Sequence, residues 1–115
     1  MNLLFHMCAR KDWEAAQAAG AYKTPSLEGE GFIHCSHPEQ IEGTANRYYQ
    51  GAAGQVLLHI DPAKVQAEIR WEASMGGETF PHIYGPLNLD AVIAVEDFMP
   101  NADGTFSYPR PADRG

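Results

Sequence analysis

Apolar and polar residues alternate along this chain with two different periods, which separate expected strands from expected helices. A period of two, or a short continuous apolar run, predicts strands at residues 3–8, 31–36, 56–61, 68–73, 80–84 and 89–98. Helical spacing predicts helices at residues 12–19 and 37–49. Because helices occupy the first half and strands dominate the second, the order predicts an α+β fold. We expect a mixed or antiparallel sheet with two main helices packed on it.

The stretch at residues 31–36 carries polar side chains at the end of an otherwise apolar strand. Side chains alternate across a strand, so Phe32, His34 and Ser36 share one face. Ser36 and Glu39 have the spacing of a capping box, and Pro38 suits the first turn of the helix that follows. Polar groups at the end of a core strand are costly unless they are hydrogen-bonded or used. This stretch is therefore the first candidate for a functional site.

Individual positions make the expected fold more specific. Residues 21–30 are expected to form a loop, and Pro81 predicts that its strand lies at an edge or contains a bulge. Trp13 and Trp71 are expected to face the core, and Asp61 is expected to cap a short turn. The inward stripe of the second helix is expected to consist of Ile41, Ala45, Tyr48 and Tyr49.

Length and composition are those of a globular protein. The chain has 115 residues, of which 44% are hydrophobic and 20% charged. We expect a single α+β domain over residues 1–108, followed by a disordered tail over residues 109–115. No apolar run approaches the roughly 20 residues needed to span a bilayer, and the first residues lack the features of a signal peptide. We therefore expect a cytoplasmic protein without a membrane partner, in which Cys8 and Cys35 are buried thiols.

The charge of the chain bears on its partners. The formal net charge is −7, and the eight Lys and Arg residues are scattered along the sequence. A nucleic-acid binder usually has a basic face, because phosphate contacts supply most of its affinity. We therefore expect no avid binding of nucleic acid. A small nucleotide, which needs only one or two cations, stays compatible with this composition.

Each of three expected strands has two polar residues that are two positions apart and therefore lie on the same face of that strand. The pairs are His34 and Ser36, Arg70 and Glu72, and His82 and Tyr84. If the strands are neighbours and their faces agree, these six side chains line one cleft. The alternative is that the faces point to water, as the alternation of Glu68, Arg70 and Glu72 by itself would suggest.

Each of these residues also has a purely structural interpretation. His34 could be a hydrogen-bonded core histidine, and Ser36 could serve only as a helix cap, since no Gly-x-Ser-x-Gly sequence marks a nucleophile. Arg70 could pair with Glu72, or it could bind a phosphate or carboxylate through two hydrogen bonds. His34 and Cys35 lack the spacing of zinc ligands and point to opposite faces of a strand. We therefore expect no metal site.

Several blocks of the sequence resemble a known bacterial family. The blocks are residues 31–36 (Gly-Phe-Ile-His-Cys-Ser), 56–61 (Val-Leu-Leu-His-Ile-Asp), 70–72 (Arg-Trp-Glu) and 80–87 (Phe-Pro-His-Ile-Tyr-Gly-Pro-Leu), with Gln40 and a tyrosine at 48 or 49. The family they resemble is domain of unknown function 952, and the resemblance covers nearly the whole chain, from Leu3 to about Phe98. This family is grouped with the ADP-ribosyltransferase-like folds. The chain also resembles the RNA 2′-phosphotransferase branch of that superfold.

The resemblance implies a split sheet and a site for NAD. Members of that superfold hold NAD in a cleft between two small sheets, which implies NAD as the cofactor of this protein. By this likeness His34 takes the ribose-binding role, Tyr84 or Tyr49 stacks on the ligand, and Glu72 completes the site. The chain departs from the phosphotransferase pattern, because the basic residues used there on RNA have no obvious counterpart beyond Arg70.

Three functional hypotheses follow. The first is a transferase that handles NAD or another nucleotide and moves an ADP-ribosyl or phosphoryl-ribose group, with His34 and Glu72 as catalytic residues. The expected ligand-binding residues are Ser36, Tyr49, Arg70, His82 and Tyr84. The alternative is a non-catalytic domain on the same fold that binds a small nucleotide-like or phosphorylated ligand. The third is an interaction protein in which the polar groups form only a hydrogen-bonded network.

Overall fold

The computed structural model describes residues 2–74 and 76–108. Its strands are β1 (Leu4–Ala9), β2 (Ala21–Tyr22), β3 (Ile33–His34), β4 (Gln55–Ile60), β5 (Glu68–Ala73), β6 (Thr79–Tyr84), β7 (Leu87–Asn88) and β8 (Val92–Phe98). Its helices are α1 (Arg10–Ala19), α2 (Pro25–Gly29) and α3 (Ile41–Tyr48), with short 3-10 helices η1 (Pro62–Lys64) and η2 (Leu89–Ala91). Every strand pairing among the described residues is antiparallel, and the α+β class is confirmed.

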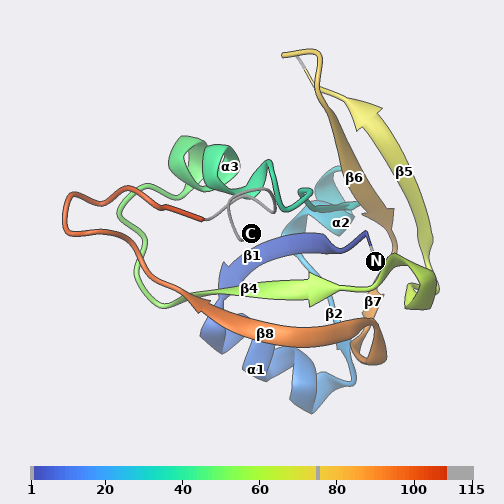
Figure 1. The fold of residues 1–115 in the computed structure, drawn as a ribbon. Helices are drawn as coiled ribbons and strands as arrows, with labels where there is room; N and C mark the ends of the chain where they lie inside the picture. Colours follow the sequence, from blue (N-terminus) through green and yellow to red (C-terminus); the bar gives the residue numbers. More distant parts are fainter. Residues whose placement is uncertain (1, 75, 109–115) are drawn as a thin grey trace.

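The strands form two three-stranded sheets and one two-stranded sheet (Figure 1). In the first sheet β4 lies between β1 and β8, and in the second β6 lies between β3 and β5. The strands β2 and β7 form the small sheet. A bridge between Phe5 of β1 and Ser36, just after β3, connects the first two sheets. The backbone N–H of each residue donates to the carbonyl of the other, at 2.7 and 2.8 Å.

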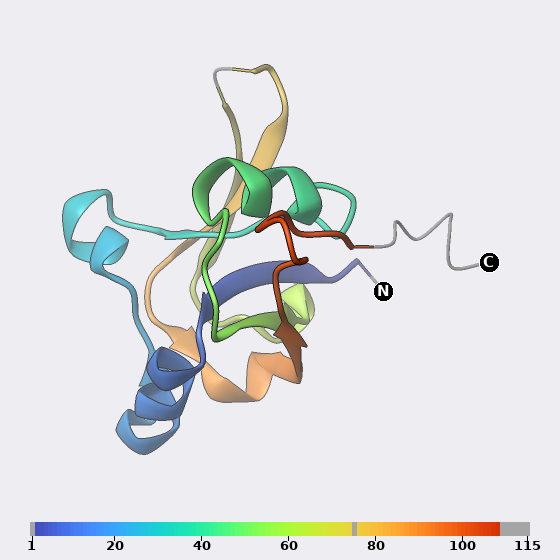
Figure 2. The same cartoon turned by 90° about the vertical axis from the view of Figure 1, so that its left-hand side faces the viewer.

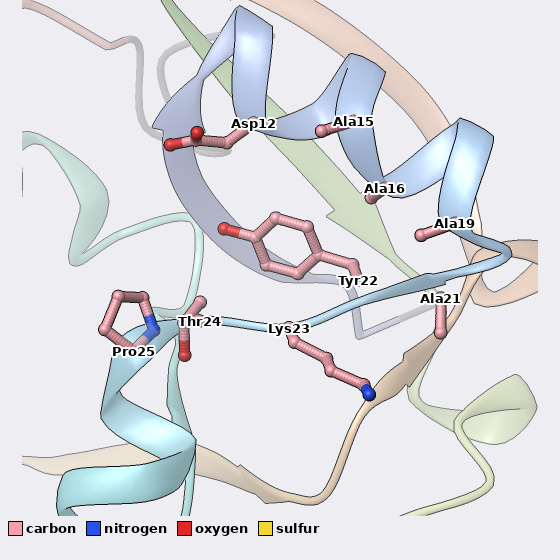
Figure 3. A pocket seen from close by; sticks show the side chains of 9 residues that line it. All are labelled: Asp12, Ala15, Ala16, Ala19, Ala21, Tyr22, Lys23, Thr24 and Pro25. Carbon is pink, nitrogen blue, oxygen red and sulfur yellow. The ribbon is translucent and has the colours of Figure 1, made fainter.

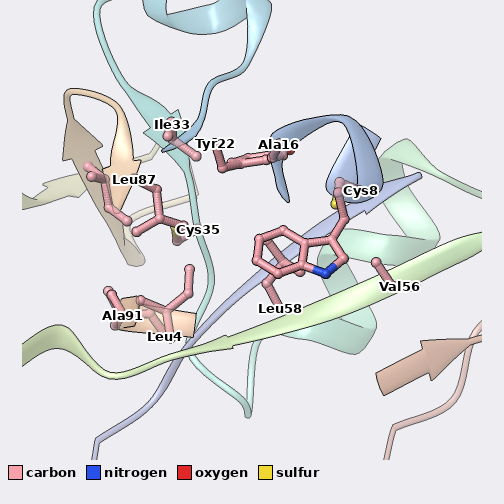
Figure 4. Close-up of a cluster of buried hydrophobic side chains, with 13 residues drawn as sticks. Leu4, Cys8, Ala16, Tyr22, Ile33, Cys35, Val56, Leu58, Leu87 and Ala91 are labelled. Carbon is pink, nitrogen blue, oxygen red and sulfur yellow. The ribbon is translucent and has the colours of Figure 1, made fainter. Parts of the chain in front are cut away.

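Strands β1 and β4 of the first sheet are buried on both faces, with α1 on one side of the sheet and α3 on the other (Figures 1 and 2). Alternation along β1 explains this arrangement. Leu4 and Cys8 pack in one apolar cluster with Trp13 of α1 (Figure 4), whereas Phe5 packs in a second cluster with Ile41 of α3. Both faces of β1 are apolar in sequence, so both require a helix to cover them.

Helix α1 follows its sequence pattern. Trp13 and Ala16 are its buried residues, and Trp13 faces the core as predicted. The helix ends at Gly20, whose φ of +89° lies in the left-handed region that glycine adopts without strain. Its backbone N–H donates to the carbonyl of Ala16 at 2.9 Å.

The helix count differs from the expectation, because α2 lies in the stretch predicted to be a loop. Ala21 and Tyr22 pair with β7, and Pro25 opens α2 at a position where no backbone N–H is needed. Turn-forming residues such as Thr24 and Ser26 misled the prediction, since the same residue types also flank short helices.

Helix α3 begins later than the sequence pattern suggests, at Ile41, and the predicted capping box is wrong. The Ser36 hydroxyl lies 3.1 Å from the hydroxyl of Thr44, inside the helix. The backbone N–H of His37 donates instead to the side-chain oxygen of Gln40, at 2.9 Å. A turn at residues 38–40 therefore separates Ser36 from the helix it was expected to cap.

Two aromatic residues that were expected in the core are exposed. Tyr48 has 71% of its surface exposed and Trp71 has 51%. Trp71 lies on β5, an edge strand of the second sheet, on the same face as the partly buried Ile69. Periodicity identified the partly buried face of β5, which carries Ile69 and Trp71. It could not show how far along that face the covering layer extends.

Pro81 lies in β6, which is a central strand, so the expectation of an edge strand is wrong. The carbonyl of Pro81 accepts from the N–H of Cys35 at 3.1 Å. Strand β3 ends at His34, just before this point. The pairing of β3 with β6 covers only two residues on each strand, so the missing N–H of Pro81 removes a single hydrogen bond at its end.

The strand predicted at residues 89–98 begins at Val92, because Leu89–Ala91 forms the 3-10 helix η2. Two further predictions are confirmed. Asp61 caps η1 by accepting from the N–H of Ala63 at 3.0 Å. Cys8 and Cys35 are buried free thiols. The predicted disordered tail at residues 109–115 lies outside the described residues. Within the described part of the chain, no helix has the length and apolar character that crossing a membrane requires.

Candidate functional site

The register of the second sheet places polar residues in a row. His82 of β6 is opposite His34 of β3 on one side and opposite Arg70 of β5 on the other. Directly opposed residues share a face of the sheet, and alternation adds Glu72 and Tyr84 to that face. Five of the predicted site residues therefore converge. Together with one aromatic neighbour they form a surface that we name the network face: Phe32, His34, Arg70, Glu72, His82 and Tyr84.

Aromatic rings make up the centre of the network face. Phe32 stacks on the imidazole of His82, with ring centroids 4.0 Å apart and an angle of 15° between planes. The rings of His34 and Tyr84 lie 4.8 and 5.2 Å from that of Phe32. The guanidinium of Arg70 lies 4.4 Å from the centre of the Tyr84 ring, a cation–π distance. These contacts fix several side chains relative to one another.

Glu72 ties two of these rings together. Its Oε1 accepts a hydrogen bond from Nδ1 of His82 at 2.7 Å and another from the hydroxyl of Tyr84 at 2.5 Å. The hydrogen bonds from Tyr84 and His82 lower the pKa of the Glu72 carboxyl, and the same contact raises the pKa of Tyr84. Glu72 is therefore ionised near neutral pH. The described residues leave its second oxygen, Oε2, without a hydrogen bond.

Two further carboxylates lie at the rim of the network face. Glu30 Oε1 lies 2.8 Å from Nε2 of His34, whose side chain is 56% exposed. Glu68 accepts two hydrogen bonds from Arg70, at 3.0 and 3.1 Å, and these lower the pKa of Glu68. With Glu72, the network face and its rim therefore carry three carboxylates and one guanidinium. Together the face and its rim are negative overall when the histidines are neutral.

Ser36 and Tyr49 do not belong to this face, which corrects their predicted place in the site. Ser36 is 3% exposed and its hydroxyl faces Thr44 in α3. Tyr49 packs against the second apolar cluster, and burial raises its pKa. Ser36 leaves the site because the chain turns after His34 to bridge with Phe5 in the other sheet. Alternation does not continue through that turn.

His6 supports the site from below, and sequence reasoning missed it. Its Nδ1 lies 2.6 Å from the backbone carbonyl of His34, which can only accept, so Nδ1 carries the proton. Its Nε2 then accepts from the hydroxyl of Tyr22, at 2.7 Å. Burial lowers the pKa of His6 to about 4. One feature of the sequence could have revealed it: His6 is the only polar residue in a strand that is otherwise apolar on both faces.

Glu30 was also missed, and there the sequence offered no signal. It follows α2, in the stretch expected to be a loop, where a spacing of four residues to His34 carries no geometric meaning. Only the observed return of the chain from α2 into β3 brings the two side chains together.

Two hollows that the structure describes lie away from the network face. The first lies between α1 and residues 21–25, with Tyr22 beside it (Figure 3). The second is bordered by Leu3, Pro38, Pro62 and Trp71, on the other face of β5. Neither of these two hollows is lined by a residue of the network face. The described ranges also hold no group of three or more His, Cys, Asp or Glu side chains that could hold a metal ion.

A family model described as a protein of unknown function, DUF952, matches residues 7–95. The chain belongs to this family. The matched range of this DUF952 protein runs from within β1 into β8 and contains the whole network face. The predicted family membership is confirmed.

This DUF952 protein is similar to protein CC0527 from Caulobacter crescentus. In the crystal structure of that protein, the match has 36% sequence identity, covers 91% of this chain and 93% of the other, and has a TM-score of 0.84. In its solution NMR structure the match covers 93% of each chain, with a TM-score of 0.81 and the same identity. A comparison with curated proteins found no match.

Proposed function

We propose that the network face binds a small nucleotide, with NAD as the first candidate, and that this DUF952 protein transfers an ADP-ribosyl or phosphoryl-ribose group. The observation that carries the proposal is the row of His34, His82 and Arg70, with Glu72 fixing its centre. The two sheets joined at the bridge after β3 also support an ADP-ribosyltransferase-like fold. The first role that we assign is ribose binding, by His34.

Arg70 is the residue proposed to hold a phosphate group. Its side chain is 51% exposed and it pairs with Glu68, whose side chain is 61% exposed. Exposed pairs of this kind contribute little to stability, typically about 1 kcal/mol or less. A ligand phosphate can therefore replace Glu68 on the guanidinium, since Arg binds phosphate through the same two parallel hydrogen bonds.

The charge of the network face narrows the choice of nucleotide. Three carboxylates against one guanidinium disfavour a ligand with many negative charges. Oxidised NAD carries a positive charge on its nicotinamide ring, which offsets one of its phosphates. We therefore expect NAD to bind more tightly than ADP-ribose, which contains the same diphosphate without the cationic ring.

The residues of the network face suit the chemistry that NAD would bring. NAD supplies a ribosyl group whose bond to nicotinamide breaks while positive charge develops on the sugar. The ionised carboxylate of Glu72 is fixed by two donors before any ligand arrives, and its Oε2 is available to a ribose hydroxyl. A fixed carboxylate stabilises such developing charge without having to reorganise.

The alternative is a non-catalytic domain that binds the same class of ligand at the same residues. The exposure of His34 and Arg70, whose side chains are 56% and 51% exposed, favours this alternative, because exposed groups do not exclude water from a reaction. Nicotinamide release separates the two functions. Binding of NAD without release of nicotinamide would assign the protein to the non-catalytic class.

The proposed function is tested by calorimetry with NAD, ADP-ribose and AMP. We expect the wild-type protein to bind NAD, and His34→Ala to bind it up to about tenfold more weakly, the equivalent of one lost hydrogen bond between neutral groups. His37→Ala is the matched control, since His37 borders the hollow beside Trp71 instead of the network face. Absence of heat with all three compounds would overturn both the transferase and the binding domain.

Glu68→Gln is expected to strengthen the binding of ADP-ribose. The substitution removes one carboxylate from the face and releases Arg70 from its charged partner. The gain should be a few-fold, as befits an exposed ion pair. Glu28→Gln serves as the control, because Glu28 lies on α2 and is not one of the carboxylates of this face. Equal affinities in Glu68→Gln and the wild type would show that Arg70 does not hold the phosphate.

A further inference from the structure

Resting on the function proposed above, we infer that His82 is the base of this site and that the acceptor it activates is a hydroxyl group. Glu72 is its positioning residue. In each of the two histidines of the network face one ring nitrogen faces a carboxylate, and this decides which nitrogen is free to take a proton. His82 therefore has a role beyond the ligand binding expected from the sequence.

The contact with Glu72 fixes the proton of His82 on one nitrogen. An ionised carboxylate can only accept a hydrogen bond, so Nδ1 of His82 must donate the bond of 2.7 Å. In the neutral ring Nε2 then carries a lone pair. None of the described residues forms a hydrogen bond with that nitrogen. A free imidazole usually holds its proton on the other nitrogen, so the fold reverses the usual form of His82.

His34 is held in the opposite way. Its Nε2 faces the carboxylate of Glu30 at 2.8 Å, so in its neutral ring Nε2 carries the proton. The two imidazoles lie 5.3 Å apart between ring centres. Neighbouring histidines therefore present different groups to a ligand. Of these two histidines, His82 is the one whose carboxylate partner bonds to Nδ1, so that Nε2 stays available to a ligand.

Packing also distinguishes the two histidines. The side chain of His82 is 14% exposed and stacks against Phe32, whereas that of His34 is 56% exposed. A ring held by a carboxylate at one end and a stacked aromatic on its face keeps its orientation when a ligand binds. Such an arrangement suits a base that must meet one proton in one direction. Tyr84 contributes by holding Glu72 in place.

The step that follows is balanced in atoms and charge. A hydroxyl group of the acceptor gives its proton to Nε2 of His82, and its oxygen forms a bond to the ribosyl carbon. The bond from that carbon to nicotinamide breaks, and the electron pair leaves with nicotinamide. The positive charge gained by His82 lies beside the ionised carboxylate of Glu72, which stabilises it. Water in place of the alcohol gives hydrolysis by the same step.

The first test needs no ligand. Long-range ¹H–¹⁵N NMR of the imidazole rings in the wild-type protein should show neutral His82 with its proton on Nδ1. In Glu72→Leu the proton should move to Nε2, the usual form. Glu30→Leu is the matched control, since it removes the carboxylate from His34 and should leave His82 unchanged. A neutral His82 with its proton on Nε2 in the wild type would overturn the inference whatever the protein binds.

The second test uses NAD with methanol as the acceptor. His82→Asn retains a donor for Glu72 but has no nitrogen in the place of Nε2. Because His82 also belongs to the binding row, this variant should bind NAD more weakly by calorimetry, while release of nicotinamide at saturating NAD falls by about a hundredfold, the usual contribution of a general base. Undiminished release by a folded His82→Asn would refute the base. A lack of NAD binding by the wild type would instead refute the proposed function and leave the NMR result standing.

Discussion

Acidification from pH 6.5 to pH 4 is expected to lower the free energy of unfolding by about 3 kcal/mol through His6 alone. Burial holds the pKa of His6 near 4 in the folded chain, against 6.5 in the unfolded chain. Between these values the unfolded chain binds the extra proton, so stability rises with pH. The contribution is fully present above pH 6.5 and is lost as the pH falls through 4.

Urea unfolding at a series of pH values measures this effect. His6→Asn keeps a donor for the carbonyl of His34 but cannot titrate, so its stability should depend less on pH between 4 and 6.5. It should also be less stable at pH 7, by about 1–3 kcal/mol, because the hydroxyl of Tyr22 loses its acceptor. His34→Asn, at an exposed side chain, should retain the wild-type slope. Equal slopes in His6→Asn and the wild type would contradict the assignment.

Ile83→Ala is expected to destabilise the protein by about 2–5 kcal/mol, the usual cost of emptying a core site. Ile83 is fully buried in β6, the central strand of the second sheet. It is opposite Ile33 on one side and Ile69 on the other, so the substitution leaves a cavity in the middle of an apolar row. That row lies on the reverse side of the sheet from the network face. Denaturant unfolding at neutral pH measures the change.

Ile93→Ala is the matched control for that prediction. The same atoms are removed there, but Ile93 is 43% exposed and lies on β8, an edge strand. Its cost should be less than about 1 kcal/mol, as for other partly exposed positions. If Ile83→Ala cost as little stability as Ile93→Ala, the second sheet would not contribute to the cooperative core.

Alternation was the most informative feature of the sequence. It assigned β5 with its observed ends, and it placed Arg70, Glu72, His82 and Tyr84 on one side of neighbouring strands. Those strands are regular and six residues long, so a period of two holds along their whole length. The two strands are consecutive in the chain and antiparallel, so their pairing is a local property of the chain.

Alternation was less informative wherever the chain left a regular strand. The strand expected at residues 31–36 has only two paired residues, because Ser36 turns to bridge with β1. The exposure of Trp71 and the pairing of Glu30 with His34 depend on contacts between segments far apart in sequence. The carboxylate that holds His82 was on the correct face. Its specific partner could be known only from the distances.

Residues 33–36 contact both sheets, so the position of His34 depends on how β1 packs. On one side this segment pairs with β6, and on the other it is hydrogen-bonded to Phe5 and His6 in β1. Any shift of β1 is passed to the backbone of His34 without a flexible linker between them. A substitution beneath β1, such as Tyr22→Phe, should alter the distance between the imidazoles of His34 and His82, although Tyr22 has no hydrogen bond to either of them.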